Sequence, residues 1–314
     1  MGKQKLIQNL KIAVVGGSKS TLACLKTLRK KKFKNLKVFY YIPSLQKNLV
    51  EYCNLKKEFI YENCEFYRFT NIKNIEKILI KNKFDVLICI GLSQLLSQKI
   101  IESTKHGCIG MHPTNLPEGK GRSSIAWNII LKKKYRITIF KLNKDIDDGQ
   151  VLVKSKFGPR NLDANSYYKR VYKDLEKLII PSINKLIFKK NLRTTKKKNG
   201  VKEFYSLRKY EDGFLNFLDS RSSLINLIKA TSSPHPGSYV SFEKKKYKVS
   251  LLMDEKNDIK YYAEPGTILN KKDRFKYLVM TKDYPIWLKV SGNFKIGQRF
   301  LVLNVYTLYK LLKK

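Results

Sequence analysis

The chain has 314 residues, of which 43% are hydrophobic and 12% aromatic, and this favours a globular protein of about two domains over a disordered one. It contains no run of about 18 uncharged apolar residues, no signal-peptide pattern and no myristoylation motif at its start, so we predict a cytoplasmic protein that does not bind membranes. The five cysteines form no C-x-x-C pair, which argues against a disulfide framework and predicts no metal site.

The formal net charge is +40, from 65 Lys and Arg against 25 Asp and Glu. Such an excess predicts attraction to polyanions such as RNA or nucleotide phosphates. The chain is also crowded with Ile, Asn, Tyr and Phe, and its lysines are spread along the whole length, as compositional drift would produce. Both explanations of the charge stay open.

Strands alternate with helices in the first part of the chain. Residues 11–17, KIAVVGG, are typical of a buried strand that ends in a glycine turn, and Ser18 or Ser20 can cap the following helix. Further strands are expected over 35–42, 64–69, 84–91 and 107–112, and helices over 74–83 and 93–104. This alternation predicts an α/β fold with a doubly wound, mostly parallel, Rossmann-like sheet.

The first glycine turn does not carry the full G-x-G-x-x-G spacing, and no acidic residue ends the second strand. A dinucleotide-dependent dehydrogenase is therefore poorly supported, and we interpret the turn as a tight link between strand and helix.

The composition of the sequence changes near residue 190, where the first domain is expected to end. Strands over 135–142 and 148–157 and a long amphipathic helix over 167–188 complete a first domain, 1–190, and the basic, turn-rich segment 191–206 is expected to be a linker. In the last domain, 207–314, a short helix over 223–233 is followed by short strands separated by Gly, Pro and Asp turns. The strands are expected over 237–253, 263–269, 275–283, 284–290 and 301–310. Their regular spacing predicts a small, OB-like β-barrel.

One histidine stands out among three. His106 and His235 occupy a helix end and a proline-braced turn, whereas His112 leaves an apolar strand and enters the rigid loop PTNLPEGKGR. A side chain at the carboxyl end of a parallel strand faces the crevice where such sheets bind ligands. A carboxylate from the later DIDDG turn would hold the imidazole in one tautomer and raise its basicity. We assign Asp145 and Asp148 to a solvated turn, which leaves Asp147 as the candidate partner.

The segments GMHPTNLPEGKGRSSIAW and DIDDGQVLV resemble the 10-formyltetrahydrofolate-dependent formyltransferases, which include methionyl-tRNA and sugar N-formyltransferases. The resemblance continues through EFYSLRKYEDGFLNF, LIKATSSPHPGSYVSFEKKKYKV and AEPGTIL, so it extends over most of the chain. It implies that 1–190 is a catalytic domain that uses 10-formyltetrahydrofolate as formyl donor.

The resemblance also implies roles for particular residues. His112 and Asp147 match the catalytic His and Asp, whereas the family's catalytic Asn falls on Gly110, so Asn115 or a backbone amide is a weak candidate to replace that donor. By the same resemblance, the folate contacts form one set and the acceptor contacts another. The folate set is Ile90, Gly91, Leu92, Leu116, Pro117 and Gly121, and the acceptor set is Arg122 and, more weakly, Lys120.

Three interpretations of the function stay open, and two of them differ in the amine acceptor. The segment after the second strand, YYIPSLQKNLVEYCNLKKEF, has no Gly/Arg-rich stretch, which slightly favours an amino sugar on a nucleotide over initiator tRNA. The net charge favours the tRNA enzyme, because phosphate contacts dominate RNA binding. The glycine at position 110 also leaves room for a non-catalytic relative that binds a nucleotide or RNA.

Overall fold

The computed structural model describes residues 2–43, 50–62, 64–189, 193–194, 203–252 and 259–303. The chain divides into two compact units. Unit 1 comprises Met1–Ser124, Lys134–Pro159 and Tyr167–Ser206, and unit 2 comprises Ile125–Lys133, Arg160–Ser166 and Leu207–Lys314. Most of the expected linker 191–206 lies outside the described residues.

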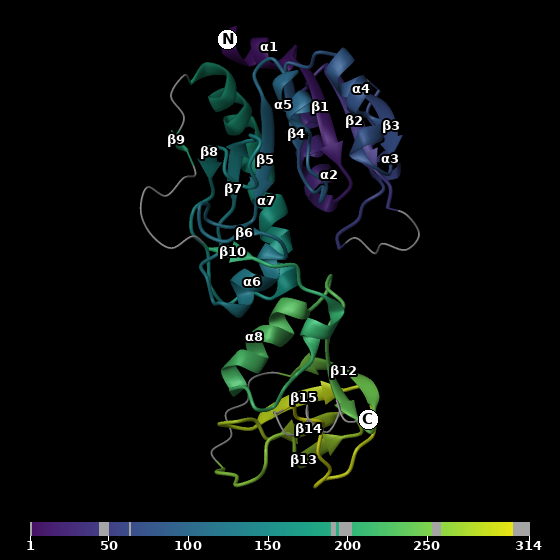
Figure 1. Cartoon of the computed structure of the whole chain (residues 1–314), viewed down its shortest axis with the longest axis vertical. Helices are drawn as coiled ribbons and strands as arrows, with labels where there is room; N and C mark the ends of the chain where they lie inside the picture. Colours follow the sequence, from purple (N-terminus) through teal and green to yellow (C-terminus); the bar gives the residue numbers. More distant parts are fainter. Residues whose placement is uncertain are drawn as a thin grey trace. The chain divides into compact units, whose positions relative to one another are not determined.

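Unit 1 is built on a sheet with the strand order β3-β2-β1-β4-β5-β7-β8-β9 (Figure 1). Strands β1 to β5 pair in parallel, and β7, β8 and β9 continue the sheet with antiparallel pairing. The strands are β1 (Lys11–Gly16), β2 (Asn35–Tyr41), β3 (Cys64–Phe69), β4 (Val86–Cys89), β5 (Cys108–His112), β7 (Thr138–Lys141), β8 (Gln150–Lys154) and β9 (Arg193–Thr194). The predicted α/β, mostly parallel fold is confirmed.

The β1 sequence explains its central place. Five of its six residues are buried, as expected of a parallel strand that is covered on both faces. The glycine turn after it is a packing feature, because a Cβ atom on Gly16 would lie 2.2 Å from the Ile90 carbonyl oxygen. Ser18 then caps the next helix, and Thr21 Oγ1 donates to that same Ile90 oxygen at 2.6 Å.

Helices in this part of the chain are short except for two. They are α1 (Gly2–Gln8), α2 (Lys19–Lys30), α3 (Leu55–Glu58), η1 (Ile72–Asn74), α4 (Glu76–Lys81), α5 (Gln98–Glu102), α6 (Ser124–Ile130) and α7 (Ala164–Phe188). The prediction of a helix over 93–104 is wrong in its first half. The Ser97 side chain caps α5 by accepting from Ile100 N, and Gln94 instead bonds backbone groups at Thr70 and Ile72, which keeps 91–97 as a loop.

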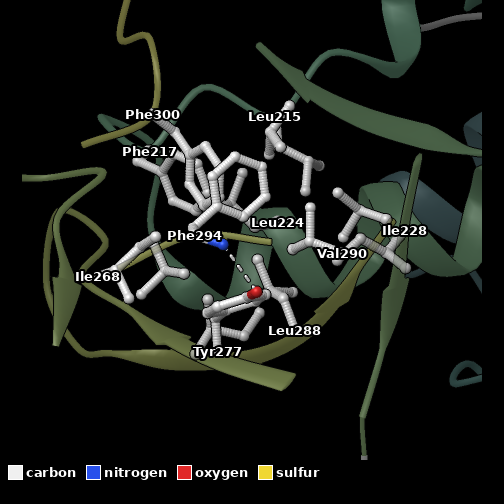
Figure 2. Close-up of a cluster of buried hydrophobic side chains, with 14 of the residues drawn as sticks. Leu215, Phe217, Leu224, Ile228, Ile268, Tyr277, Leu288, Val290, Phe294 and Phe300 are labelled. Atoms are coloured by element: carbon white, nitrogen blue, oxygen red, sulfur yellow. Dashed lines mark hydrogen bonds between the residues drawn. The ribbon is translucent and has the colours of Figure 1, made fainter. Parts of the chain in front are cut away.

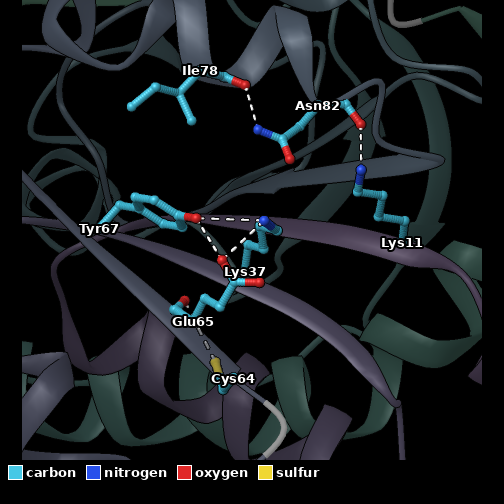
Figure 3. Close-up of polar contacts among 7 residues, drawn as sticks. All are labelled: Lys11, Lys37, Cys64, Glu65, Tyr67, Ile78 and Asn82. Carbon is cyan, nitrogen blue, oxygen red and sulfur yellow. Dashed lines mark hydrogen bonds and ion pairs between the residues drawn. The ribbon is translucent and has the colours of Figure 1, made fainter.

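A polar network joins the outer strands β2 and β3 (Figure 3). Lys37 Nζ donates to Glu65 Oε2 at 2.9 Å, and the Tyr67 hydroxyl donates to the same oxygen at 2.5 Å. The Tyr67 and Lys37 hydrogen bonds lower the pKa of Glu65. Nearby, Lys11 Nζ donates to the Asn82 carbonyl oxygen at 2.6 Å. Each of these polar groups has a partner within the sheet or its neighbouring helix, so we interpret the network as structural.

Unit 2 contains an antiparallel sheet with the order β11-β12-β15-β14-β13 (Figure 1). Its strands are β11 (Ser238–Phe242), β12 (Lys245–Leu251), β13 (Ile268–Asp273), β14 (Lys276–Val279) and β15 (Ile286–Val290), and its helices are η2 (Tyr210–Gly213) and α8 (Arg221–Thr231). The strand predicted over 301–310 lies largely outside the described residues, and 301–303 are not in a strand.

The core of unit 2 packs the helix α8 against the inner face of this sheet (Figure 2). Leu224 and Ile228 from α8 meet Leu288 and Val290 from β15 in one buried cluster. Tyr277 brings a hydroxyl into this core, and the hydroxyl accepts from Phe294 N at 3.0 Å and can donate its proton to the carbonyl oxygen of Arg274, at 2.5 Å, or of Gly292, at 2.9 Å. The buried oxygen is therefore satisfied.

Candidate functional site

The candidate site begins where β5 ends. His112 is the last residue of β5, which pairs in parallel with β4 on one side and antiparallel with β7 on the other. The loop after it is fixed by side chains that are distant in sequence. The Tyr167 hydroxyl donates to the Pro113 carbonyl oxygen at 2.8 Å, and Thr138 Oγ1 donates to the Thr114 carbonyl oxygen at 2.8 Å while accepting from Leu116 N at 3.1 Å.

His112 and Asp147 lie together, as the sequence analysis expects. His112 Nδ1 is 3.4 Å from Asp147 Oδ2, and both side chains are largely buried, at 8% and 16% exposed. The other ring nitrogen, Nε2, is 2.9 Å from the Gly119 carbonyl oxygen. Asp147 Oδ2 also accepts from Gly121 N at 2.9 Å, so the carboxylate links the end of β5 to the loop that follows it.

Asp147 has a backbone φ of +51°, in the left-handed region. Asp and Asn adopt this conformation more readily than other non-glycine residues. An aspartate in this turn therefore meets both a backbone and a charge requirement.

Both ring nitrogens of His112 face oxygens that only accept. The neutral ring has one proton and can donate it to Asp147 or to Gly119, whereas the protonated ring donates to both. Burial lowers the pKa of His112, while the charge of Asp147 and the bond to Gly119 act in the opposite direction. The ring is thus neutral at neutral pH and has a partner ready to stabilise its cation.

The assignment of Asp148 to a solvated turn is wrong. Its side chain is 13% exposed and forms an ion pair with Lys120 Nζ, and the Lys120 side chain is itself only 11% exposed. A buried ammonium needs such a partner, which local turn chemistry does not reveal. Lys120, a weak acceptor-contact candidate, is thus engaged within the loop, while Asp145 is exposed as expected.

Asn115 lies in the same loop, where its side chain is oriented by two cations. Its Oδ1 accepts from Lys154 Nζ at 3.0 Å and from Arg136 Nη1 at 3.3 Å. Lys154 Nζ also donates to the Leu116 carbonyl oxygen. Sequence reasoning missed Lys154 and Arg136, because they lie 21 to 39 residues from the loop and no local pattern marks them.

The place of the family asparagine is filled by another side chain. A Cβ atom on Gly110 would lie 2.5 Å from Cδ2 of Leu142, which packs against the core of unit 1. An amide at position 110 would therefore need Leu142 to move.

The proposed folate contacts fall on two loops at one edge of the sheet, because β4 and β5 are parallel neighbours. Ile90 and Leu116 are buried, at 1% and 0% exposed, so their side chains serve packing. Gly91 has φ +71°, and a Cβ atom there would lie 1.8 Å from Ser18 Oγ, so only glycine fits. Leu92 and Pro117 are half-buried. Leu95, which the sequence analysis does not single out, is 68% exposed at this edge.

Gly121 and Arg122 leave the loop through a short parallel pair, β6 (Lys120–Gly121) with β10 (Phe204–Tyr205). A Cβ atom on Gly121 would lie 2.4 Å from the Tyr205 carbonyl oxygen, so glycine permits the close approach. Arg122 N donates to that oxygen at 2.9 Å, and the Arg122 side chain is exposed, as an acceptor contact requires.

Two further properties concern the described part of the chain. No group of three or more His, Cys, Asp or Glu side chains there could hold a metal ion. None of the helices in that part combines the length and apolarity needed to cross a membrane.

Relatives with known sequences match both parts of the chain. The bifunctional polymyxin resistance protein ArnA of Wigglesworthia glossinidia brevipalpis is 27% identical over 79% of this chain, which spans only 38% of ArnA. The methionyl-tRNA formyltransferase of Malacoplasma penetrans is 26% identical over 91% of this chain and 90% of its own length.

Solved structures share the fold. WlaRD, a sugar 3N-formyl transferase crystallised with dTDP and 5-N-formyl-THF, has a TM-score of 0.60 and 16% identity, over 91% of this chain and 99% of WlaRD. HypX from Aquifex aeolicus, crystallised with tetrahydrofolic acid, has a TM-score of 0.59 and 13% identity, over 89% of this chain and 43% of HypX.

Family models give the assignment. Residues 10–183 match the model described as formyl transferase, and residues 208–292 match that of the formyl transferase C-terminal domain. Because these matches cover most of the chain, the protein belongs to the formyl transferase family.

Proposed function

We propose that the protein transfers a formyl group from 10-formyltetrahydrofolate to a primary amine, and that the amine belongs to an amino sugar carried on a nucleotide. The observation that carries this proposal is the buried His112–Asp147 pair at the carboxyl edge of the parallel sheet. Formyl transfer to an amine releases one proton from that amine, and the pair supplies an acceptor for it at this edge.

His112 is the proton acceptor in the proposed reaction. One proton leaves the amine as its nitrogen bonds the formyl carbon, and the bond between that carbon and the donor nitrogen breaks. The neutral ring takes the proton and later returns it to the departing nitrogen, so protons balance. The imidazolium formed in between is flanked by Asp147 and the Gly119 carbonyl oxygen, both of which favour a positive charge.

The loops around His112 suit a flat donor with polar edges. Exposed Leu95 offers an apolar contact, and Gly91 and Pro117 lie on the loops that follow β4 and β5. Two structural neighbours were crystallised with folates, which supports the choice of donor. The folate supplies an activated formyl group, so the protein's part is to bind, orient and move one proton.

Asn115 is our candidate for the amide that position 110 lacks. With its Oδ1 held by Lys154 and Arg136, its Nδ2 group is oriented as a donor. A donor to the developing oxyanion contributes about 10²–10³ in rate. The variant N115A tests this role, because an unchanged turnover would remove Asn115 from the mechanism and leave a backbone amide as the candidate.

The acceptor proposal has three supports. The segment that follows β2 in the sequence carries no Gly/Arg-rich stretch, and the exposed Arg122 suits a compact anionic acceptor. A fold neighbour that covers most of this chain is described as a sugar N-formyl transferase.

A panel of acceptors tests the proposal directly. The full chain is mixed with 10-formyltetrahydrofolate and either nucleotide-linked amino sugars or methionyl initiator tRNA, and formylated product is detected by mass spectrometry. D147N, in which the rate should fall about 10²–10⁴-fold, serves as the comparison variant. Product on a sugar nucleotide supports the proposal, and no product on either acceptor would overturn formyl transfer, leaving a binding protein.

Methionyl-tRNA formyl transfer is the second candidate. The Malacoplasma enzyme of that name aligns over 91% of this chain, and the net charge of +40 suits an RNA acceptor. Product on the tRNA alone, with a rate that falls steeply as salt rises, would establish this alternative.

A further inference from the structure

A basic pocket of about 490 Å³ lies within unit 2, away from every residue assigned above. Four cations line it, and they come from separate parts of the sequence. Lys132 follows α6, Arg160 precedes α7, and Arg221 and Lys229 lie on α8. Bringing four positive charges together costs free energy unless an anion joins them.

The single acidic side chain among the described residues that line the pocket is already engaged. Asp283 Oδ1 accepts from Arg221 N at 2.8 Å, Tyr284 N at 2.9 Å and Thr281 Oγ1 at 2.9 Å. These bonds hold the carboxylate against the start of α8. Its charge therefore offsets only part of the positive charge of the pocket.

The two lysines are held in place by neutral partners. Lys132 Nζ donates to Ser222 Oγ at 2.5 Å, and Lys229 Nζ donates to Asn161 Oδ1 at 2.7 Å. Neither contact neutralises the ammonium group, and each leaves it two further protons to donate. The lysines are thus positioned before any ligand arrives.

Asn226 adds an uncharged polar side chain to the pocket. It lines the pocket from α8 and is only 7% exposed, so the fold holds it in place. A side-chain amide can both donate and accept hydrogen bonds, so it can pair with a polar edge of a ligand whose anionic part meets the cations.

We propose that this basic pocket binds a phosphorylated small molecule of nucleotide size. Its phosphates would contact Arg160, Arg221 and the two lysines, and a polar edge of the ligand would pair with Asn226. Tyr284, which is 69% exposed at the rim, offers a face on which a base can stack. The volume lies in the range of small-molecule sites, which favours a compact ligand over a nucleic acid backbone.

Calorimetric titration of the full chain tests the pocket without folate or amine, so failure of the formyl-transfer proposal would leave its outcome unaffected. The probes are ADP, pyrophosphate, adenosine and a short RNA duplex. We expect saturable binding of ADP, weaker binding of pyrophosphate and none of adenosine. R160Q/K229Q should weaken ADP binding at least about tenfold, because each lost charged hydrogen bond is worth about 1.5–3 kcal/mol.

Two further variants keep the test decisive. N226D keeps the shape of the side chain but adds a carboxylate, so it should weaken ADP binding even if R160Q/K229Q folds poorly. K245Q/K295Q removes the same charge from exposed positions of unit 2 outside the pocket and should leave binding unchanged. Equal weakening by this control, absence of ADP binding, or tight duplex binding that ADP does not displace would overturn the proposal.

Discussion

The loop that follows β5 in unit 1 and the basic pocket of unit 2 differ in how their charged side chains are balanced. In the loop, Lys120 meets Asp148, His112 meets Asp147, and Lys154 meets two oxygen acceptors. In the pocket, four cations lie among described lining residues that include a single carboxylate, and that carboxylate is already bonded to backbone N–H groups.

The difference separates two uses of a charged side chain. A compensated charge in a buried loop fixes geometry, and its loss leaves a partner buried and unpaired. A lysine that is held by a neutral partner in an open pocket, as Lys132 and Lys229 are, is available to a ligand. Variants in the loop should therefore damage structure and rate, whereas variants in the pocket should damage binding alone.

Removing the charge of Asp147 should have the largest effect. D147N keeps a residue that tolerates φ +51° but cannot stabilise the imidazolium of His112. We expect kcat/KM for formyl transfer to fall about 10²–10⁴-fold, the range of a lost acid–base contribution. Steady-state kinetics with the accepted amine measure it. A decrease below about threefold would contradict the proposed pairing.

Replacing Lys154, which we interpret as a positioning residue, should have the next largest effect on the rate. K154M removes the donor to Asn115 and Leu116 but keeps most of the apolar stem. We expect the two lost charge-assisted bonds to lower kcat about 10–100-fold. K156M, a change at an exposed lysine two residues away, is the matched control. If K154M raised KM alone, Lys154 would contact substrate instead of orienting the loop.

Much of this architecture could be predicted from the sequence. Strands such as 64–69 are readable because their apolar and aromatic residues form a compact run, and the structure gives β3 the same bounds. The segment 93–104 was harder, because Leu95 and Leu96 suggest a helix that the Ser97 cap and the Gln94 bonds restrict to its second half. Local propensity is decided there by contacts to residues 70–72.

The residues of the candidate site also divide into those that the sequence predicts and those that it does not. The order of His112 and Asp147 along the chain, read with the family resemblance, identified a pair that the fold places 3.4 Å apart. Lys154 and Arg136 could not be found, because only the strand pairing of β5, β7 and β8 brings them to Asn115. Asp148 was misread for a similar reason, since its partner Lys120 is 28 residues away.

Filling position 110 should show how little free space the catalytic region has. In G110N, the new Cβ atom would meet Leu142 Cδ2 at 2.5 Å, so a core side chain must shift. We expect the free energy of unfolding to fall by about 1–3 kcal/mol, as overpacking does. Chemical denaturation measures it. L142A should relieve the clash, so if G110N costs as much in that background, the clash is not the cause.

Lowering the pH should decrease the stability of the folded chain through the buried imidazole of His112. Burial lowers the pKa of His112, so below the ordinary value of about 6.5 the unfolded chain binds a proton that the folded chain does not. Stability therefore falls as the pH drops from 6.5 toward the lowered pKa. Burial also lowers the pKa of His106 and His235, so the comparison must be with H112Q. That variant should lose less stability between about pH 7 and 5.5.

Removing charge from the basic pocket should have the smallest effect on the free energy of unfolding. The sign of that effect distinguishes the pocket from the loop that follows β5. In R160Q/K229Q, two cations are lost and, among the described contacts, the charge-assisted hydrogen bond from Lys229 to Asn161 is broken. We expect the free energy of unfolding to stay within about 1 kcal/mol of wild type and to rise slightly at low salt, where repulsion is least screened. Thermal denaturation at two ionic strengths measures it. A large loss at both would mean that these cations fix structure, as the loop cations do.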